Sequence, residues 1–307
     1  MPPSRAACIV LALSVALPGC IGRRSESPRP KAFPVRVTDD EGIAVTLPHP
    51  PTRIVSAAPH FSETLFALGL GDRVVAVSGA ETYPPEALTV PPVLPEGSFE
   101  PDPAALEALR ADLVLTTGGP GAAWKTALRD RGFAIVTLNA ATVAKALDDI
   151  RTIGRLTGTA AAASRLARRI QGQLDEVQTA IGRRSPPSLY LEVGPRFPPL
   201  VGAAPSSLTG ELARLAGGRL VTDGEQAPYP EWPVERLAQA DPDVYVVTSA
   251  SVASAAELRS RPGFARLRAV QTGRTGTVDD ELVLLPGPRL GEGVRALARL
   301  LHPDAGL

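Results

Sequence analysis

Residues 53–70, RIVSAAPHFSETLFALGL, decide the fold class of this chain. An apolar run from Arg53 to Ala58 is followed by a short turn and then by apolar residues that recur at helical spacing. This pattern predicts a buried strand, a loop at its carboxyl end, and a helix that starts near Ser62 and stops at Gly69. One strand, one loop and one helix form the repeating element of an α/β protein.

The same alternation recurs along the chain. In the first half it predicts further strands at 74–77, 113–116 and 134–138, with helices at 103–109 and 122–129. After Pro186-Pro187 it predicts strands at 189–193, 244–247 and 276–278, with a helix at 208–215. A short hairpin, 35–38 with 43–47, precedes the first parallel strand. The predicted fold class is α/β, with two parallel-sheet lobes and a ligand cleft between them.

A long segment without proline separates the two halves. From Thr142 to Arg184 the apolar residues recur at three and four positions, which predicts helix throughout, with Gly154 and Gly158 as candidate breaks. Thr159–Arg183 alone would run about 37 Å at 1.5 Å per residue. We predict a rigid helix that joins the lobes; the alternative is a packed helical hairpin. The predicted domains are 33–140, the connecting helix 141–185, and 186–307.

The N-terminus has the order of an export signal. Arg5 precedes an apolar run, Ala6–Leu17, which is too short for the roughly 20 helical residues that span a bilayer. Leu17-Pro18-Gly19-Cys20 then predicts a lipoprotein signal peptide over 1–20, with lipid on Cys20 and a polar, proline-rich flexible tether over 21–32. The expected location is extracytoplasmic, on the periplasmic face of a bacterial membrane. Cys8 lies inside the signal, so the mature chain has one thiol and no disulfide or thiolate metal cluster.

Several function classes find no support in the sequence. The 32 basic and 32 acidic residues balance, so no nucleic-acid partner is expected. No phosphate-binding loop, nucleophile elbow or His-Glu-x-x-His pair is present, and three histidines are too few for a closed zinc site. We therefore predict a protein that is not an enzyme, with no catalytic residue and no metal site. The alternative is an exported hydrolase-like α/β enzyme that uses His60 and Glu63 as acid and base.

Loops at the carboxyl ends of parallel strands form the ligand crevice of open α/β sheets. This rule selects the segments 59–63, 79–83, 118–121, 194–197 and 279–281. Within them, His60 is the best single polar contact for a ligand; the alternative is a histidine with a structural role only. Glu63 is open to two interpretations, a ligand contact or a carboxylate that caps free amides in the first helical turn, and the second is favoured.

These residues carry a resemblance that covers nearly the whole mature chain. The stretches VTDDEG at 37–42, PTRIVS at 51–56 and PHFSE at 59–63, followed by LFALG, are similar to the first lobe of the iron-siderophore and vitamin B12 periplasmic binding proteins. Further matches are YPPEA at 83–87, LRADLV at 109–114, LAGG at 215–218 and ADPDV at 240–244. Their order and spacing together make the resemblance specific.

The resemblance implies a two-lobed receptor that delivers a chelate or corrinoid to a membrane importer of the ABC type. It also implies that a glutamate on each lobe docks onto the permease subunits. Glu235 falls at the second-lobe position, whereas Ala104 occupies the first-lobe position, so Glu107, one turn along, is the candidate there, with Glu100 nearby. The receptor is expected to act as a monomer. A sensory or scaffolding lipoprotein with the same fold is a further alternative.

The resemblance also implies the ligand contacts. Tyr229 falls where vitamin B12 receptors place a stacking tryptophan, Ser98 and Phe99 lie near the position of their other tryptophan, and Glu281 lies near the family's acidic cleft residue. The full predicted set of ligand-binding residues is His60, Phe61, Tyr83, Ser98, Phe99, Arg196, Tyr229, Trp232 and Glu281. The expected ligand is cobalamin or a related metal chelate, with no resident cofactor; the alternatives are a ferric siderophore or haem. Anionic siderophores would want several arginines in the cleft, where only Arg196 and Arg289 are candidates.

Overall fold

The computed structural model describes residues 33–94, 100–118, 122–194, 199–251 and 255–307. The predictions for the signal peptide, the tether, Cys20, Ser98, Phe99 and Arg196 fall on residues outside these ranges. Among the described residues, no helix is both long and apolar enough to cross a membrane.

The first lobe is built on a parallel four-stranded sheet with the strand order β4-β3-β5-β6. The strands are β3 (Ile54–Ser56), β4 (Val74–Ala76), β5 (Leu113–Thr116) and β6 (Ile135–Thr137), and the helices are α1 (Pro59–Ala67), α2 (Pro103–Ala108) and α3 (Ala122–Asp130). Every residue of β3, β5 and β6 is buried, as expected for a parallel sheet covered on both faces. The strand order reverses at β3, so the loops after β3 and β5 flank a topological switch point.

The second lobe repeats this arrangement with the parallel strand order β12-β11-β7-β9. The strands are β7 (Ser188–Glu192), β9 (Arg219–Leu220), β11 (Val244–Thr248) and β12 (Thr275–Val278). Its helices are α6 (Leu208–Leu215), α7 (Val234–Ala240), α8 (Ala255–Ser260), α9 (Arg268–Gln271), α10 (Asp280–Leu284) and α11 (Leu290–Leu301). Two short antiparallel pairs are also present, β1 (Val35–Thr38) with β2 (Ala44–Leu47), and β8 (Leu200–Val201) with β10 (Glu231–Trp232). The predicted fold class is confirmed.

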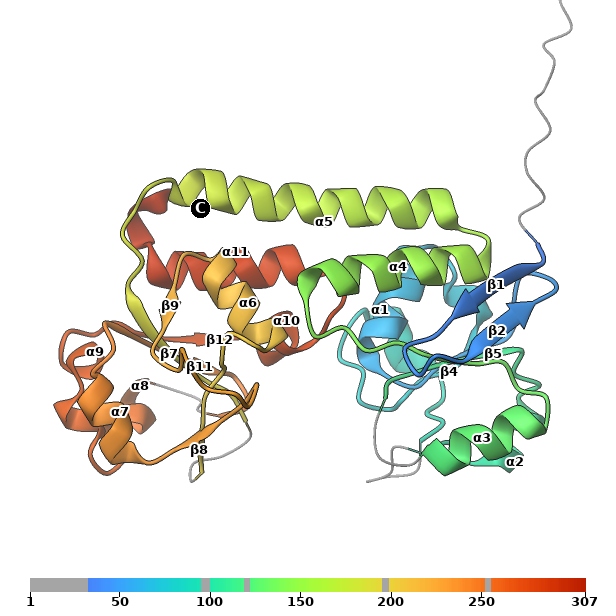
Figure 1. The fold of residues 1–307 in the computed structure, drawn as a ribbon, viewed down its shortest axis with the longest axis horizontal. Coiled ribbons are helices and arrows are strands. Elements are labelled where there is room, and N and C mark those ends of the chain that lie inside the picture. The colour runs from blue at the N-terminus through green and yellow to red at the C-terminus, as the bar shows by residue number, and fades with distance from the viewer. Residues whose placement is uncertain (1–32, 95–99, 119–121, 195–198, 252–254) are drawn as a thin grey trace, which may run out of the picture. The chain divides into compact units, whose positions relative to one another are not determined.

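The connection between the lobes differs from the single helix predicted for 141–185. It consists of α4 (Val143–Thr157) and α5 (Ala160–Ile181), which are separated at Gly158. Gly158 has φ +78°, the left-handed conformation that commonly ends a helix and that glycine adopts without strain. α5 packs against α4 and, farther along, against α11 of the second lobe (Figure 1). The 22 residues of α5 make it about 33 Å long, so this one helix contacts both halves.

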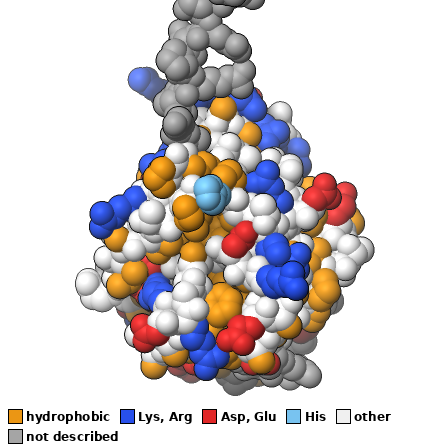
Figure 2. Space-filling model, turned by 90° about the vertical axis from the view of Figure 1, so that its right-hand side faces the viewer, with side chains coloured by type: hydrophobic (Ala, Val, Ile, Leu, Met, Phe, Trp, Pro, Cys, Tyr) orange, Lys and Arg blue, Asp and Glu red, His pale blue; other side chains and the backbone are white. Residues whose placement is uncertain are grey.

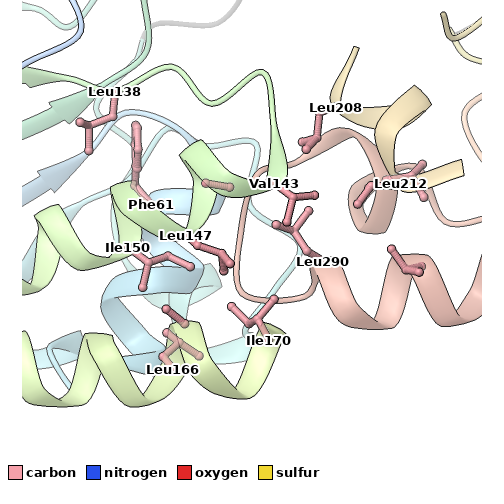
Figure 3. Close-up of a cluster of buried hydrophobic side chains, with 14 of the residues drawn as sticks. Phe61, Leu138, Val143, Leu147, Ile150, Leu166, Ile170, Leu208, Leu212 and Leu290 are labelled. Atoms are coloured by element: carbon pink, nitrogen blue, oxygen red, sulfur yellow. The ribbon is translucent and has the colours of Figure 1, made fainter. Parts of the chain in front are cut away.

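One apolar core is continuous through both lobes. Figure 3 shows part of it, where side chains of α1, α4 and α5 meet those of α6 and α11. Phe61, predicted as a ligand-binding residue, lies in this cluster and is only 1% exposed. The helix α1 begins at Pro59, three residues earlier than expected, and this places Phe61 on the face that packs inward.

The charged side chains are mixed on the surface. On the face shown in Figure 2, basic and acidic groups are interspersed among apolar and uncharged polar ones. This distribution agrees with the balanced charge of the sequence.

Candidate functional site

A cavity of about 520 Å³ lies between the two lobes, at the carboxyl ends of the first lobe's strands. The first lobe contributes the loops that follow β3, β5 and β6, and the second lobe contributes the start of α6 and the loops before β10 and after α10. We call this space the interlobe cavity. Its lining residues are Ala58, Pro59, His60, Thr117, Leu138, Asn139, Ala140, Ala141, Ser206, Ser207, Leu208, Pro228, Tyr229, Leu284, Leu285 and Pro286. Strand order therefore predicts the location of the cavity, because two of these loops flank the switch point after β3 and β5.

The lining of the interlobe cavity is apolar and uncharged. Leucine, proline and alanine side chains predominate, and the polar groups are hydroxyls, one amide and one imidazole. No aspartate, glutamate, lysine or arginine is among the described lining residues. Such a surface suits a ligand with a broad apolar face, since a charged ligand would be desolvated there without a partner.

Tyr229 is held in a defined position beside the cavity. The Thr209 hydroxyl donates to the carbonyl oxygen of Val283 at 2.9 Å and lies 3.2 Å from the Tyr229 hydroxyl. A threonine hydroxyl has one proton to donate, so the Tyr229 hydroxyl donates to Thr209. With its hydroxyl fixed, the 39% exposed ring can present an apolar face to a ligand.

His60 is a neutral imidazole at the edge of the cavity. Its side chain is 7% exposed, and Nδ1 has no hydrogen-bond partner in the described part of the chain. Burial lowers the pKa of His60 to about 4, because the charged form would lose its hydration without gaining a counter-ion. At neutral pH the ring therefore keeps a free lone pair.

A cluster of charged and polar side chains joins the lobes beside the cavity. Arg289, between α10 and α11, donates from Nε to Glu63 Oε2 at 3.0 Å and from Nη2 to Glu63 Oε1 at 2.6 Å. Nη2 also lies 2.9 Å from Glu281 Oε2, and the guanidinium stands 4.5 Å from the centre of the Tyr83 ring. The Thr82 hydroxyl donates to Glu281. We call these five residues the polar seam.

The contacts of the polar seam contradict the capping interpretation of Glu63 and place Tyr83 and Glu281 outside the lining of the interlobe cavity. Glu63 is the fifth residue of α1, beyond the first turn, so it binds Arg289 instead of capping the helix. Burial raises the pKa of Glu63, an effect that Arg289 partly offsets. Tyr83 and Glu281 lie in the seam, and Tyr83 borders a second cavity of about 830 Å³ whose lining includes Arg169 and Gln173 of α5. His60 and Tyr229 are thus the predicted contacts that meet at the interlobe cavity.

Trp232, also predicted as a ligand contact, packs in the second lobe and does not line the interlobe cavity. The side chain is 5% exposed, its Nε1 donates to Glu225 Oε1 at 3.1 Å, and its ring lies 5.6 Å from that of Tyr190. It belongs to an apolar core of the second lobe that is separate from the core shared by both lobes.

The two predicted docking carboxylates lie on the surface, one in each lobe. Glu235 is exposed in the first turn of α7. Glu107 is exposed on α2 and forms an ion pair of 3.3 Å with Arg131. The two positions therefore differ in charge, because the carboxylate of Glu107 is paired with the Arg131 guanidinium.

Sequence reasoning missed the loop after β6 and the start of α6. Asn139 accepts from the backbone N–H of Gly118 at 2.5 Å, and its own N–H donates to Asp40 at 2.6 Å, which fixes the loop that borders the cavity. Ser207 caps α6 by accepting from the N–H of Gly210 at 2.9 Å. The strand-end rule could have found the first of these segments, because 134–138 was itself predicted as a strand.

Two α/β lobes with a cavity between them, joined by a helix that contacts both, are the architecture of periplasmic substrate-binding proteins. The model of the periplasmic binding protein family matches residues 54–282, and the chain belongs to this family. The resemblance inferred from the sequence motifs is thereby confirmed.

Individual relatives agree with this assignment. The ABC transporter substrate-binding lipoprotein YvrC of Bacillus subtilis is 30% identical over 96% of this chain and 96% of its own. A cobalamin-binding protein of Halobacterium salinarum is 27% identical over 97% of this chain and 84% of its own. Among solved structures, the periplasmic heme-binding protein BhuT, in complex with two hemes, matches with a TM-score of 0.74 and 25% identity over 84% of this chain and 99% of its own.

Proposed function

We propose that the protein captures a metal-bearing tetrapyrrole, cobalamin or haem, in the interlobe cavity and delivers it to an ABC-type importer. The observation that carries the proposal is the lining of the cavity, which is apolar and free of charged side chains in its described part. Corrins and porphyrins present broad, largely apolar faces that such walls can bury, whereas the two propionate groups of haem would have to stay in solvent at the mouth of the cavity. The cobalamin-binding relative and the heme-binding structural neighbour support the same ligand class.

A ferric siderophore is the second candidate, and the charge of the cavity argues against an anionic one. Arg289 was one of two arginines considered for that role, yet its guanidinium is occupied by Glu63 and Glu281. A polyanionic chelate in the interlobe cavity would therefore be desolvated without a cationic partner among the described lining residues.

A catalytic role for His60 and Glu63 finds no support in their geometry. The carboxylate of Glu63 is bound by Arg289, and Nδ1 of His60 has no hydrogen-bond partner among the described residues. General acid–base catalysis would need the two groups within hydrogen-bond reach of a reacting atom and of an orienting partner. The proposed role is therefore binding and delivery without chemistry on the ligand.

Lipidation and docking complete the proposal. Lipid on Cys20 would hold the receptor at the outer face of a membrane, as the name of the lipoprotein relative supports. Glu235 on the second lobe and Glu107 on the first would contact the permease subunits, and the exposure of both supports this role.

Calorimetric titration of the purified protein tests the proposed ligand class. The panel is cyanocobalamin, hemin, a ferric hydroxamate and a ferric tris-catecholate. Binding of a tetrapyrrole at micromolar concentration or below, with the tris-catecholate at least tenfold weaker, is the expected result; a factor of ten corresponds to about 1.4 kcal/mol. Preference for the tris-catecholate would refute the assignment.

A further inference from the structure

The end of α4 and the first half of α5 carry basic charge with no acidic residue between them. From Ile150 to Leu174 the chain contains five arginines and no aspartate or glutamate, although the whole sequence has 32 basic and 32 acidic residues. The five are Arg151, Arg155, Arg165, Arg168 and Arg169. The first of them is half-buried and the other four are exposed. The charge of this segment therefore differs from that of the chain as a whole.

These arginines lack the ion pairs that charged side chains form elsewhere on the surface. None of the five is within ion-pair distance of a carboxylate among the described residues. By contrast, Glu176 in the second half of α5 pairs with Arg295 at 3.0 Å. Arg155 donates to the hydroxyl of Thr152, which is uncharged. An exposed guanidinium without a carboxylate partner presents its full charge, and up to five N–H donors, to whatever lies outside the protein.

Four of the five arginines form one patch. Arg169 is set apart, because it lines the second cavity together with the carboxylates of Asp72, Glu86 and Glu292. The other four do not line that cavity. We call them the basic patch: Arg151 and Arg155 of α4, with Arg165 and Arg168 of α5. Asp148, about one turn before the patch, is the nearest acidic residue in sequence, and four arginines with one aspartate leave a net charge of +3.

The described part of the chain begins beside the basic patch. A Cβ placed on Gly158, in the turn between α4 and α5, would lie 3.3 Å from the ring of Phe33. This turn separates Arg155 from Arg165. Thirteen positions separate Phe33 from Cys20, and that many residues span at most about 45 Å when fully extended. Lipid on Cys20 would therefore keep the patch near the bilayer.

We propose, building on the lipid anchor proposed above, that the basic patch binds anionic phospholipids of the membrane that holds the anchor. Guanidinium groups bind phosphate oxygens through paired N–H donors, and each arginine close to an anionic bilayer strengthens the attachment. The attraction falls off within a Debye length, about 10 Å, so it acts on a face that is held near the surface. Because the anchor makes the contact intramolecular, a few arginines are sufficient.

The position of the basic patch gives this contact a consequence for delivery. Figure 1 shows α5 along the edge of the molecule opposite α2 and α7, which carry the proposed docking carboxylates Glu107 and Glu235. With the patch on the bilayer, these carboxylates point away from the membrane. Binding to lipid and docking onto the permease are therefore alternative orientations of the receptor. A weak contact that depends on salt allows exchange between them.

The test measures which face of the lipidated protein lies near the bilayer. The mature protein, with lipid on Cys20 verified by mass spectrometry, is incorporated into vesicles of phosphatidylcholine and phosphatidylglycerol at a ratio of about 2:1, or of phosphatidylcholine alone. A donor dye is attached to Gly172→Cys on α5 or to Gln239→Cys on α7, and the acceptor is a headgroup-labelled lipid. A Cβ at Gly172 has open space and Gln239 is exposed, so both positions accept the label.

A pair of double variants isolates the basic patch. Arg165→Gln/Arg168→Gln removes half of its arginines. Arg214→Gln/Arg219→Gln is the matched control, because it removes the same charge from two exposed arginines of the second lobe that also lack an ion pair among the described residues. Glutamine and arginine have similar helix propensities, and far-UV circular dichroism establishes that each variant is folded.

On anionic vesicles we expect more energy transfer from the label on α5 than from the label on α7. The excess should disappear on phosphatidylcholine alone, and also in about 1 M salt, where the Debye length is about 3 Å. Arg165→Gln/Arg168→Gln should lower the ratio of attached to detached protein by roughly tenfold or more. The control variant should keep the wild-type difference between the two labels.

Three results would overturn the inference, and they are distinguishable. Equal transfer from the two labels in wild type, or equal losses in the patch and control variants, would exclude the basic patch while the lipid anchor stands. The same excess on phosphatidylcholine alone would mean that charge does not orient the protein, and would exclude the patch as well. If Cys20 carries no lipid, the proposed anchoring fails and the membrane contact fails with it.

Discussion

Arg289 and Glu63 form a bidentate ion pair that joins the second lobe to the first helix of the first lobe, with donor–acceptor distances of 3.0 and 2.6 Å. The side chain of Glu63 is 3% exposed and that of Arg289 is 13% exposed. Charge-assisted, bidentate pairs of this kind are directional, so the pair specifies the relative placement of α1 and the segment before α11. It does so next to the interlobe cavity, because Pro286 lines that cavity and a Cβ added at Gly287 would lie 3.3 Å from His60 Cβ.

Replacing Arg289 by alanine should lower the free energy of unfolding by about 3 kcal/mol, because it leaves a buried carboxylate without its partner. Urea denaturation measures the effect. Arg295→Ala is the matched control: its partner Glu176 is 69% exposed, so we expect a loss of about 0–1 kcal/mol. Adding Glu63→Gln to Arg289→Ala should recover part of the loss. Equal losses for Arg289→Ala and Arg295→Ala would show that the polar seam contributes no more than a surface pair.

The close approach at Gly287 predicts a steric effect. A Cβ there would lie 3.3 Å from both Glu63 Oε2 and His60 Cβ, so Gly287→Val should destabilise the protein by roughly 1–3 kcal/mol through overpacking. Gly172, within α5, has open space around its Cβ position. Gly172→Ala should therefore stabilise the protein by about 0.5–1 kcal/mol, as alanine is the better helix former. Thermal denaturation of both variants separates the two effects, and a neutral Gly287→Val would contradict the packing described.

The depressed pKa of His60 predicts acid sensitivity. Between pH 6.5 and about 4, the unfolded chain takes up a proton on this histidine and the native protein does not, so stability falls as the pH falls through this window. Across the whole window the contribution is roughly 3–4 kcal/mol, at about 1.4 kcal/mol per pKa unit. His60→Gln should lack it, so unfolding free energies measured at pH 6.5 and pH 4.5 should converge for the two proteins. A parallel pH dependence in both would mean that His60 titrates normally.

The docking proposal predicts a loss of delivery without a loss of capture. The family resemblance implies that permease arginines receive this glutamate, so Glu235→Arg should weaken the complex by about tenfold or more, because like charges across an interface cost several kcal/mol. Glu107→Arg should have a smaller effect, since that carboxylate already pairs with Arg131. Ligand affinity should be unchanged in both variants, and Glu176→Arg on α5 is the control. Binding to the importer in lipid nanodiscs is the measurement, and an equal effect of the control would remove Glu235 from the interface.

The sequence predicts the sheets well and the site only in part. Apolar runs such as 113–116 and 244–247 become fully buried strands because a parallel sheet covered on both faces needs continuous apolar residues. The strand-end rule correctly placed His60 at the cavity. Helical periodicity alone could not show that Phe61 faces inward, since moving the start of α1 by three residues changes which face each position occupies.

Long-range pairings were beyond the reach of local patterns. Glu63 and Arg289 are 226 positions apart, and nothing in either segment specifies the other. Trp232 is a second example of this limit. In the sequence, an aromatic residue between prolines fits the wall of a cleft and a second core equally well. Its contacts with Tyr190 and Glu225 in the structure place it in a core. Family resemblance located the loops, and only the packed structure assigned each side chain in them to a surface or to a core.

The most direct test of the central claim is to fill the interlobe cavity and measure ligand affinity. Ser206 lines the cavity and its side chain is exposed, so Ser206→Trp would occupy the space without disturbing the described core, and Ser206→Ala is the control. We expect wild type and Ser206→Ala to bind cyanocobalamin or hemin alike, and Ser206→Trp to bind about tenfold or more weakly, a loss of at least about 1.4 kcal/mol. Unchanged affinity in a folded Ser206→Trp protein would contradict the assignment of this cavity as the binding site.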